Sequence, residues 1–594
     1  MNWTKTIRTA NVFLLITAFF LAALGLASCG GGGGGSAGTA PPATTLGGVA
    51  AAGAPIIGMV TVKDSSAPTA QTKSTMIAAD GRYSVDVAGM TAPFMVRADG
   101  RVGDREYHVF SAATAADVGG TINVTPLTDL ILANIAGQLA EDYYNSGDFS
   151  TLTEGELAAA ENALKETLLP VLEAVGLDNS IDLLRASFSA DHTELDAALD
   201  ILRVTMDPET AIATITNIVN NETVENDIST GDFTGTLTSE GVTTGVTDIQ
   251  AISALCDTFS SLFATSIPDP DDPRLLALFD SDTFLEGGQS LAAFLSERTL
   301  DPGMIGVRFT NLSIVEIDTA AGTAIVSFTV MYQGQPLSEG LKPWHAKKVG
   351  GNWRLQGDQR IATVDAHTKA NAYDELWGTG LATGVEFEIR DQGGLGIDYA
   401  IVKGPGLPGD GVLLVNDIAS EHFSLVAEPY YPGNNFYSMT DLQIASIPET
   451  GAVYTIELWE ANGTPENTAD DTLLASYDDA IMRRPVLNAD LSASNFVQFT
   501  PETVAAIASF NGGSFTVNWT LPAGLVADWV ELRIEDAGFS NYAEAESSLA
   551  RTATSKSLTV DATSESGPFT VARRHIWVSA YDIYGRAFTT GIGR

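Results

Sequence analysis

Short segments in which apolar and polar residues alternate recur along most of this chain. Examples are Arg82–Val87, Val385–Arg390, Tyr454–Glu460 and Trp529–Ile534. Because successive side chains of a β-strand point to opposite faces, such alternation is typical of antiparallel sheets with one buried face. A chain of 594 residues is also too long for a single hydrophobic core. The sequence therefore predicts a multidomain, mainly β protein made of β-sandwiches, with a small helical region and one α+β domain.

The N-terminal residues have the order of a secretory signal. Lys5 and Arg8 form a positive region, Val12–Ala27 form an apolar segment, and six glycines follow Cys29. The sequence Leu-Ala-Ser-Cys at residues 26–29 resembles the lipobox of bacterial lipoproteins. This resemblance implies cleavage between Ser28 and Cys29 and lipid attachment at Cys29. The alternative is a transmembrane helix, but the apolar segment is shorter than the roughly 20 residues that span a bilayer.

The lipobox resemblance also predicts where the protein resides. We expect a signal peptide at residues 1–28 and a flexible Gly-rich tether at residues 29–53. Residue 30 is Gly, whereas an Asp after the lipidated cysteine resembles an inner-membrane retention signal of Gram-negative lipoproteins. The prediction is an exported lipoprotein whose membrane partner is reached through the lipid on Cys29, located in the outer membrane.

Charge and cysteine content exclude several classes of function. The net charge is −43, and a body this acidic repels phosphate backbones, so no nucleic-acid partner is expected. Only two cysteines are present, and lipid on Cys29 leaves no pair for an intramolecular disulfide. Cys256 lies in an apolar helical stripe, which favours a buried thiol over a reactive one. Two cysteines are too few for covalent haem or thiolate-bound iron–sulfur clusters, and we expect no cofactor.

Three domains are predicted between the tether and residue 247. Residues 54–124 are expected to form short strands, and Ala54–Gly58 with Ala79–Val85 resembles the carboxypeptidase regulatory-like, transthyretin-like β-sandwich. At Thr125 the apolar period changes to 3.6, and Pro126 suits the first position of a helix, so residues 125–202 are expected to be helical. Residues 203–247 are predicted to be a hairpin and a connector.

Residues 248–372 combine helices with strands that follow them. This order, together with the hairpin Trp344–Leu355, resembles the nuclear-transport-factor-two-like cone fold, which implies an enclosed pocket. Trp344 and His345 are neighbours on a strand, so only one of the two can face that pocket. The candidate pocket residues are Tyr332, Trp344, His345, Trp353, Asp358 and Arg360.

The remaining residues predict two further β-sandwiches, at 373–491 and 492–594. Aromatic residues gather between two strands of the first, at Phe423, Tyr430, Tyr431, Phe436 and Tyr437. They would form a stacking platform for sugars if exposed and ordinary core if buried. In the second, Trp519 and the late strand ending at residues 581–585 resemble a fibronectin type III domain, a family that spaces or binds other proteins.

No motif for catalysis or metal binding stands out, and the six histidines are scattered singly. We therefore expect no catalytic residues and no metal site. The favoured hypothesis is a non-catalytic binding, adhesion or scaffold protein at the cell surface, with a protein or polysaccharide ligand. Two alternatives remain open: an enzyme or small-ligand binder that uses the cone pocket, and a carbohydrate-binding adhesin.

Overall fold

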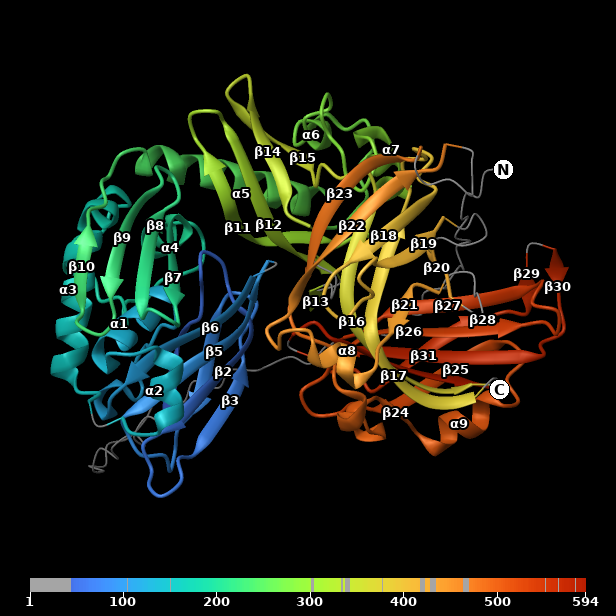
Figure 1. Ribbon diagram of the computed structural model, residues 1–594, viewed down its shortest axis with the longest axis horizontal. Helices are drawn as coiled ribbons and strands as arrows, with labels where there is room; N and C mark the ends of the chain where they lie inside the picture. The colour runs from blue at the N-terminus through green and yellow to red at the C-terminus, as the bar shows by residue number, and fades with distance from the viewer. Residues whose placement is uncertain are drawn as a thin grey trace, which may run out of the picture. The chain divides into compact units, whose positions relative to one another are not determined.

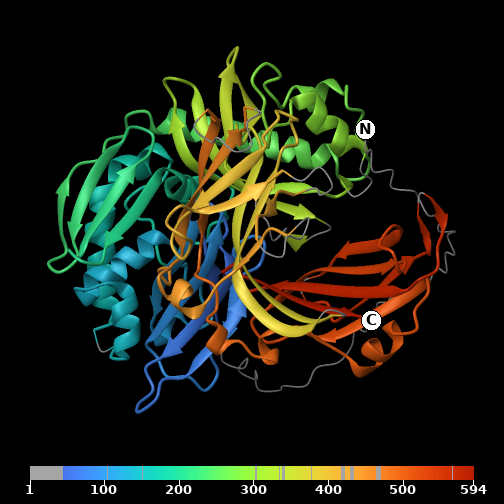
Figure 2. The same cartoon turned by 45° about the vertical axis from the view of Figure 1, so that its right-hand side comes forward.

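The protein is mainly β, with several separate sheets and few helices, which confirms the predicted fold class (Figures 1 and 2). The computed structural model describes residues 44–103, 105–149, 151–300, 304–332, 335–336, 342–375, 378–416, 422–427, 434–462, 470–550, 552–564, 566–582 and 584–594. In these stretches of the chain, no helix is both long enough and apolar enough to cross a membrane.

The first strands form two small sheets. β1 (Thr45–Val49) pairs antiparallel with β4 (Arg82–Asp86), and a second sheet has the order β3-β2-β5-β6. The bounds of its strands are Ile57–Asp64 for β2, Thr72–Met76 for β3, Phe94–Val102 for β5 and Arg105–Ala113 for β6.

The predicted tether is too long at its C-terminal end, because β1 begins at Thr45 and buries Leu46 and Val49. A glycine in this strand serves close packing rather than flexibility. A side chain at Gly48 would lie 1.8 Å from the carbonyl oxygen of Ile122, so only glycine fits there.

Four helices follow, as expected for residues 125–202. They are α1 (Pro126–Ala136), α2 (Ala140–Ser146), α3 (Glu154–Ala174) and α4 (Glu194–Ile201). The hydroxyl of Thr125 accepts the backbone N–H of Thr128, and Gly137 ends α1 in a left-handed conformation.

The predicted hairpin after α4 is part of a four-stranded sheet with the order β10-β9-β8-β7. Its strands are β7 (Leu202–Asp207), β8 (Ile212–Asn217), β9 (Glu222–Asp227) and β10 (Asp232–Gly235). The expectation of a connector is thus wrong for residues 222–235. Their Thr, Gly and Asp content suggested a connector, but Val224 in β9 and Ile228 directly after it are buried.

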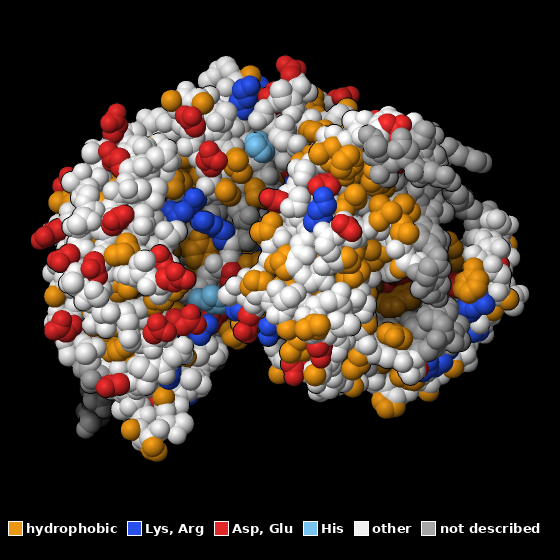
Figure 3. Space-filling view, in the orientation of Figure 1, with side chains coloured by type: hydrophobic (Ala, Val, Ile, Leu, Met, Phe, Trp, Pro, Cys, Tyr) orange, Lys and Arg blue, Asp and Glu red, His pale blue; other side chains and the backbone are white. Residues whose placement is uncertain are grey.

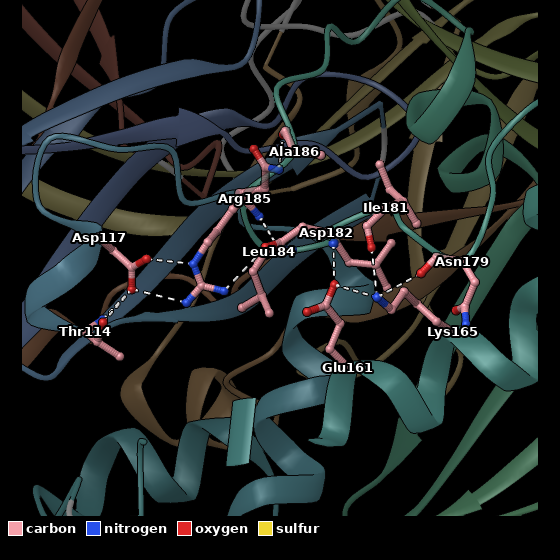
Figure 4. Close-up of polar contacts among 12 residues, drawn as sticks. Thr114, Asp117, Glu161, Lys165, Asn179, Ile181, Asp182, Leu184, Arg185 and Ala186 are labelled. Atoms are coloured by element: carbon pink, nitrogen blue, oxygen red, sulfur yellow. Dashed lines mark hydrogen bonds and ion pairs between the residues drawn. The ribbon is translucent and has the colours of Figure 1, made fainter. Parts of the chain in front are cut away.

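Charged side chains hold the loop between α3 and α4 (Figure 4). The guanidinium of Arg185 donates to both carboxylate oxygens of Asp117, at 2.6 and 3.2 Å. Glu161 accepts the backbone N–H of Leu183 at 2.7 Å, and Lys165 donates to the carbonyl of Ile181 at 2.9 Å. These contacts fix the path of the chain into α4.

The next region has helices α5 (Val242–Leu262), α6 (Pro273–Leu276) and α7 (Leu291–Leu300), followed by a sheet with the order β11-β12-β14-β15. β13 (Gln335–Pro336) pairs with the C-terminal end of β12. The other strands are β11 (Arg308–Asp318), β12 (Thr323–Tyr332), β14 (Trp344–Val349) and β15 (Asn352–Gly357). Cys256 of α5 is buried as predicted, and burial raises the pKa of its thiol to about 12.

The next region contains a sheet with the order β20-β19-β18-β22-β23. Its strands are β18 (Tyr399–Lys403), β19 (Val412–Val415), β20 (Ser424–Leu425), β22 (Ala452–Glu460) and β23 (Thr472–Ile481), and the helix α8 (Asp441–Ala445) precedes β22. β16 (Thr363–Glu375), β17 (Gly378–Arg390) and β21 (Phe436–Ser438) belong to a seven-stranded sheet instead. Residues 363–372, which we assigned to the cone domain, therefore lie in this sheet.

The seven-stranded sheet, β21-β17-β16-β32-β31-β26-β27, joins the two regions that we predicted as separate sandwiches. β32 (Ala587–Gly593) pairs in parallel with β16 and antiparallel with β31 (Arg573–Tyr581). The remaining C-terminal elements are β24 (Gln498–Phe499), α9 (Pro501–Ile507), β25 (Gly513–Thr520), β26 (Val526–Glu535), β27 (Tyr542–Ser548), β28 (Ser555–Val560), β29 (Thr563–Ser564) and β30 (Gly567–Pro568).

Candidate functional site

Aromatic side chains pack around Trp344 in the β11–β15 region, where a pocket was predicted. The side chain of Trp344 is fully buried, and its ring centroid lies 5.3 Å from that of Phe328 and 5.8 Å from that of Phe309. Phe284 and Phe294 lie at 5.9 Å. Most of these rings meet edge to face, the geometry favoured by aromatic side chains in a packed core. We call these five side chains the Trp344 core.

The other predicted pocket residues of β14 and β15 do not converge on one site. His345 is half-buried on the face of β14 opposite to Trp344, and burial lowers its pKa. Trp353 is buried, and its indole N–H donates to Oδ1 of Asp248 at 2.9 Å. The side chain of Tyr332 lies outside the described residues.

Asp358 and Arg360 bind the backbone. Oδ1 of Asp358 accepts the N–H groups of Gly287 and Arg360, at 3.0 and 2.9 Å. The guanidinium of Arg360 donates to the carbonyl of Val364 at 3.2 Å. Glu286, which the sequence analysis missed, accepts the N–H of Asp358 at 2.8 Å, and burial, together with the charge of Asp358, raises its pKa to about 8. These groups hold loops together around the end of β15.

An apolar surface covers one face of the sheet formed by β18, β19, β22 and β23. The rings of Tyr399 and Trp459 are cross-strand neighbours, parallel to within 2° and 6.2 Å apart. Leu473 pairs with Trp459, and 47% of its surface is exposed. Figure 3 shows orange side chains gathered over these strands. We define the Tyr399 face as the side chains of Tyr399, Ile401, Leu413, Val426, Trp459 and Leu473.

Alternation along the strands explains why these residues point outward. Ala400, Val402 and Leu414 face the core and are buried, so their neighbours Ile401 and Leu413 must face the other way. Leu413 and Val426 are 40% and 52% exposed. An exposed apolar surface of this kind on a folded protein is a candidate site of interaction.

The aromatic residues that we predicted to form one cluster differ in their burial. Phe423 is buried, and Phe436 and Tyr437 are half-buried on β21. Tyr430 and Tyr431 lie outside the described residues. The aromatic pair on the Tyr399 face is thus a different one from the predicted platform.

A cavity of about 370 Å³ lies beside β6, α1 and β7, and its volume is in the range of small-molecule sites. Asp129 of α1 lines it and accepts the N–H of Phe110 at 3.2 Å. Burial and the charge of Glu141 raise the pKa of Asp129 to about 8. His108, also on the wall, contacts Asp99 at 2.7 Å and Glu106 at 2.9 Å, which raises its pKa to about 9.

We expect Asp129 to make stability depend on pH. Its pKa in the folded protein is about 8, above the usual 3.8, so the folded state holds the proton that the unfolded state releases between these values. Stability is then lost as the pH rises from about 4 to 8. One pKa unit corresponds to about 1.4 kcal/mol. Between pH 5 and pH 8, the free energy of unfolding of the unchanged protein should therefore fall by at least about 2 kcal/mol more than that of Asp129→Asn. Denaturant unfolding of both proteins at pH 5 and pH 8 measures this difference. If the free energy of unfolding changed equally in the two proteins, the raised pKa of Asp129 would be contradicted.

Comparisons with known proteins leave the family open. No protein-family model matches the chain, and no curated protein matches it. Among solved structures, a tetra-tandem repeat from the extending region of a large adhesion protein is 11% identical, with 93% of this chain and 98% of that chain covered and a TM-score of 0.13.

Two other solved structures are similar over about half of this chain. The FN1–FN3 domains of chicken CNTN1 are 10% identical over 47% of this chain and 96% of that chain, with a TM-score of 0.13. A 1.5-MDa bacterial ice-binding adhesin is 11% identical over 46% of this chain and 90% of that chain, with a TM-score of 0.12. TM-scores this low do not carry a fold or a function over to this chain.

Proposed function

We propose that this chain is an exported protein, anchored to the outer membrane through lipid on Cys29, that binds a protein partner through the Tyr399 face and acts as a non-catalytic adhesion or scaffold protein. The exposed apolar side chains of that face carry the proposal. Cys29 and Ser28 lie outside the described residues, and the anchor rests on the lipobox alone.

The composition of the Tyr399 face favours a protein over a polysaccharide. Aliphatic side chains make up most of it, with Ile401, Leu413, Val426 and Leu473 around the aromatic pair. The polar groups beside it are mostly engaged: Lys403 contacts Glu457 at 2.7 Å, and the hydroxyl of Tyr399 donates to Asp471 at 2.6 Å. The indole N–H of Trp459 lacks a partner among the described residues. A sugar-binding surface would offer several free hydrogen-bonding groups beside its aromatic rings, whereas an apolar centre with a polar rim is typical of a protein interface.

The Trp344 core weighs against the alternative of an enzyme that uses the cone pocket. Aromatic rings pack around Trp344 in the interior of this region, and Asp358 and Arg360 are bonded to backbone groups. Acid–base catalysis needs titratable groups that reach one reacting atom.

Binding by the soluble chain from Ser36 to Arg594 tests the proposal. We expect it to bind one or more proteins on an array of surface and matrix proteins, and Trp459→Ala to weaken that binding by about 2 kcal/mol, or roughly thirtyfold, because central aromatic residues dominate interfaces. Tyr542→Ala is the matched control, since it removes an exposed aromatic ring from β27, on a different sheet. Binding to glycans alone would favour the carbohydrate-binding alternative. Equal binding by the Trp459 variant would exclude this face.

A further inference from the structure

Three side chains, two in α4 and one just before it, gather in a buried position. His192 precedes the helix by two residues, and Asp196 and Asp200 lie one helical turn apart on the same face. One potential ligand atom of each residue lies within 4.8 Å of those of the other two. Asp196 is fully buried, and the side chains of Asp200 and His192 are only 1% and 12% exposed.

His192 is bonded to both carboxylates, to one through its backbone and to the other through its imidazole. Its backbone N–H donates to Oδ2 of Asp196 at 2.7 Å, and its Nδ1 lies 2.9 Å from Oδ2 of Asp200. The carbonyl of His192 accepts the side-chain amide of Gln250 on α5 at 2.9 Å. His192 itself adopts φ +61°, a conformation that is uncommon for residues other than glycine. The three side chains are therefore positioned by both α4 and α5.

Each carboxylate keeps one oxygen without a partner. Oδ1 of Asp196 and Oδ1 of Asp200 are inaccessible to solvent and accept no hydrogen bond from the part of the chain that the structure describes. Buried carboxylate oxygens are almost always hydrogen-bonded, because an unsatisfied one loses its hydration without compensation. Two buried acids thus lie beside one imidazole, and each has an oxygen without a hydrogen-bond partner among the described residues.

We propose that His192, Asp196 and Asp200 bind a divalent transition-metal ion, with Zn²⁺ as the preferred ion. Mixed imidazole and carboxylate ligands suit zinc, whereas Ca²⁺ takes oxygen ligands only. Two carboxylates and a neutral imidazole also balance the charge of a divalent cation. Three protein ligands leave one position of a tetrahedral site for water. This site lies on different elements from the Tyr399 face and is independent of the proposed function.

The test is Zn²⁺ titration of the untagged soluble chain from Ser36 to Arg594, after treatment with a chelator. We expect one Zn²⁺ per chain by calorimetry and a melting temperature that rises with the Zn²⁺ concentration. Asp196→Asn and Asp200→Asn should each lower the affinity for Zn²⁺ at least about tenfold. Mutation of residues that only hydrogen-bond to metal ligands already changes metal affinity by this much. Both substitutions keep the volume of the side chain.

Glu194→Gln is the matched control, because it removes the same charge from an exposed side chain in the same turn of α4. It should bind Zn²⁺ as tightly as the unchanged protein. Co²⁺ gives a second measurement: its visible absorption should appear in the unchanged protein and disappear in Asp200→Asn, with unaltered circular dichroism. Failure of the unchanged protein to bind stoichiometric Zn²⁺, or equal affinity in the Asp196 and Asp200 variants, would leave only a His–Asp ion pair and overturn the proposal.

Discussion

Trp344→Ala is expected to unfold the sheet of β11–β15 locally, at a cost of about 3–5 kcal/mol. The ring is fully buried, and Phe284, Phe294, Phe309 and Phe328 contact it. Its removal leaves a large cavity that these rings can fill only in part. Hydrogen exchange of peptides from β12 and β14 measures the effect directly, without requiring the whole chain to unfold as one unit.

His345→Ala is the control for this substitution. It changes the neighbouring side chain on the opposite, half-buried face of β14, and we expect a loss of less than about 1 kcal/mol. If the Trp344 substitution left hydrogen exchange in β12 and β14 unchanged, the interior around this side chain would not be tightly packed. The idea of a ligand pocket in this sheet would then regain support.

Cys29→Ala is expected to release nearly all of the protein from the membrane fraction. Acyl chains contribute about 0.8 kcal/mol for each buried methylene, and a single chain binds only reversibly, so lasting anchoring needs the several chains of a mature lipoprotein. Sedimentation of membranes and mass spectrometry of the N-terminal peptide measure the two parts of this prediction. The peptide should begin at residue 29 and carry the mass of its lipid.

Cys256→Ala serves as the matched control, since it removes the chain's other cysteine from a buried position on α5. This variant should stay with the membrane. An unmodified residue 29 in the unchanged protein, or equal sedimentation of both cysteine variants, would remove the basis for anchoring and for the predicted location.

Local patterns predicted much of the secondary structure. Alternation identified strands such as β4, β17 and β22, and Thr125 with Pro126 marked the start of α1, because these signals act within a few residues. Pairings between distant segments left no such signal. Nothing local distinguishes β32 as a partner of β16, and Gly47 and Gly48 resemble a flexible linker although they lie in β1.

The candidate sites were harder to predict than the fold. The spacing His192-x₃-Asp196-x₃-Asp200 could have been noticed, since within a helix it would put one potential ligand on each successive turn, although α4 itself begins at Glu194. Its importance depends on burial and on unpaired oxygens, which a sequence does not reveal. The Tyr399 face could not be predicted from the sequence either. The pattern of a strand does not tell which of the two faces of the sheet another part of the chain will cover.

The position of β32 has a consequence for the order of assembly. It lies between β16 and β31. Arg594, directly after β32, contacts Asp374 of β16, and the two residues are 220 positions apart in the sequence. In the proposed export the chain crosses the inner membrane N-terminus first, so β16 has an open edge until residues 587–593 arrive. Open strand edges invite pairing with other molecules. During this interval the nascent protein would therefore depend most on chaperones.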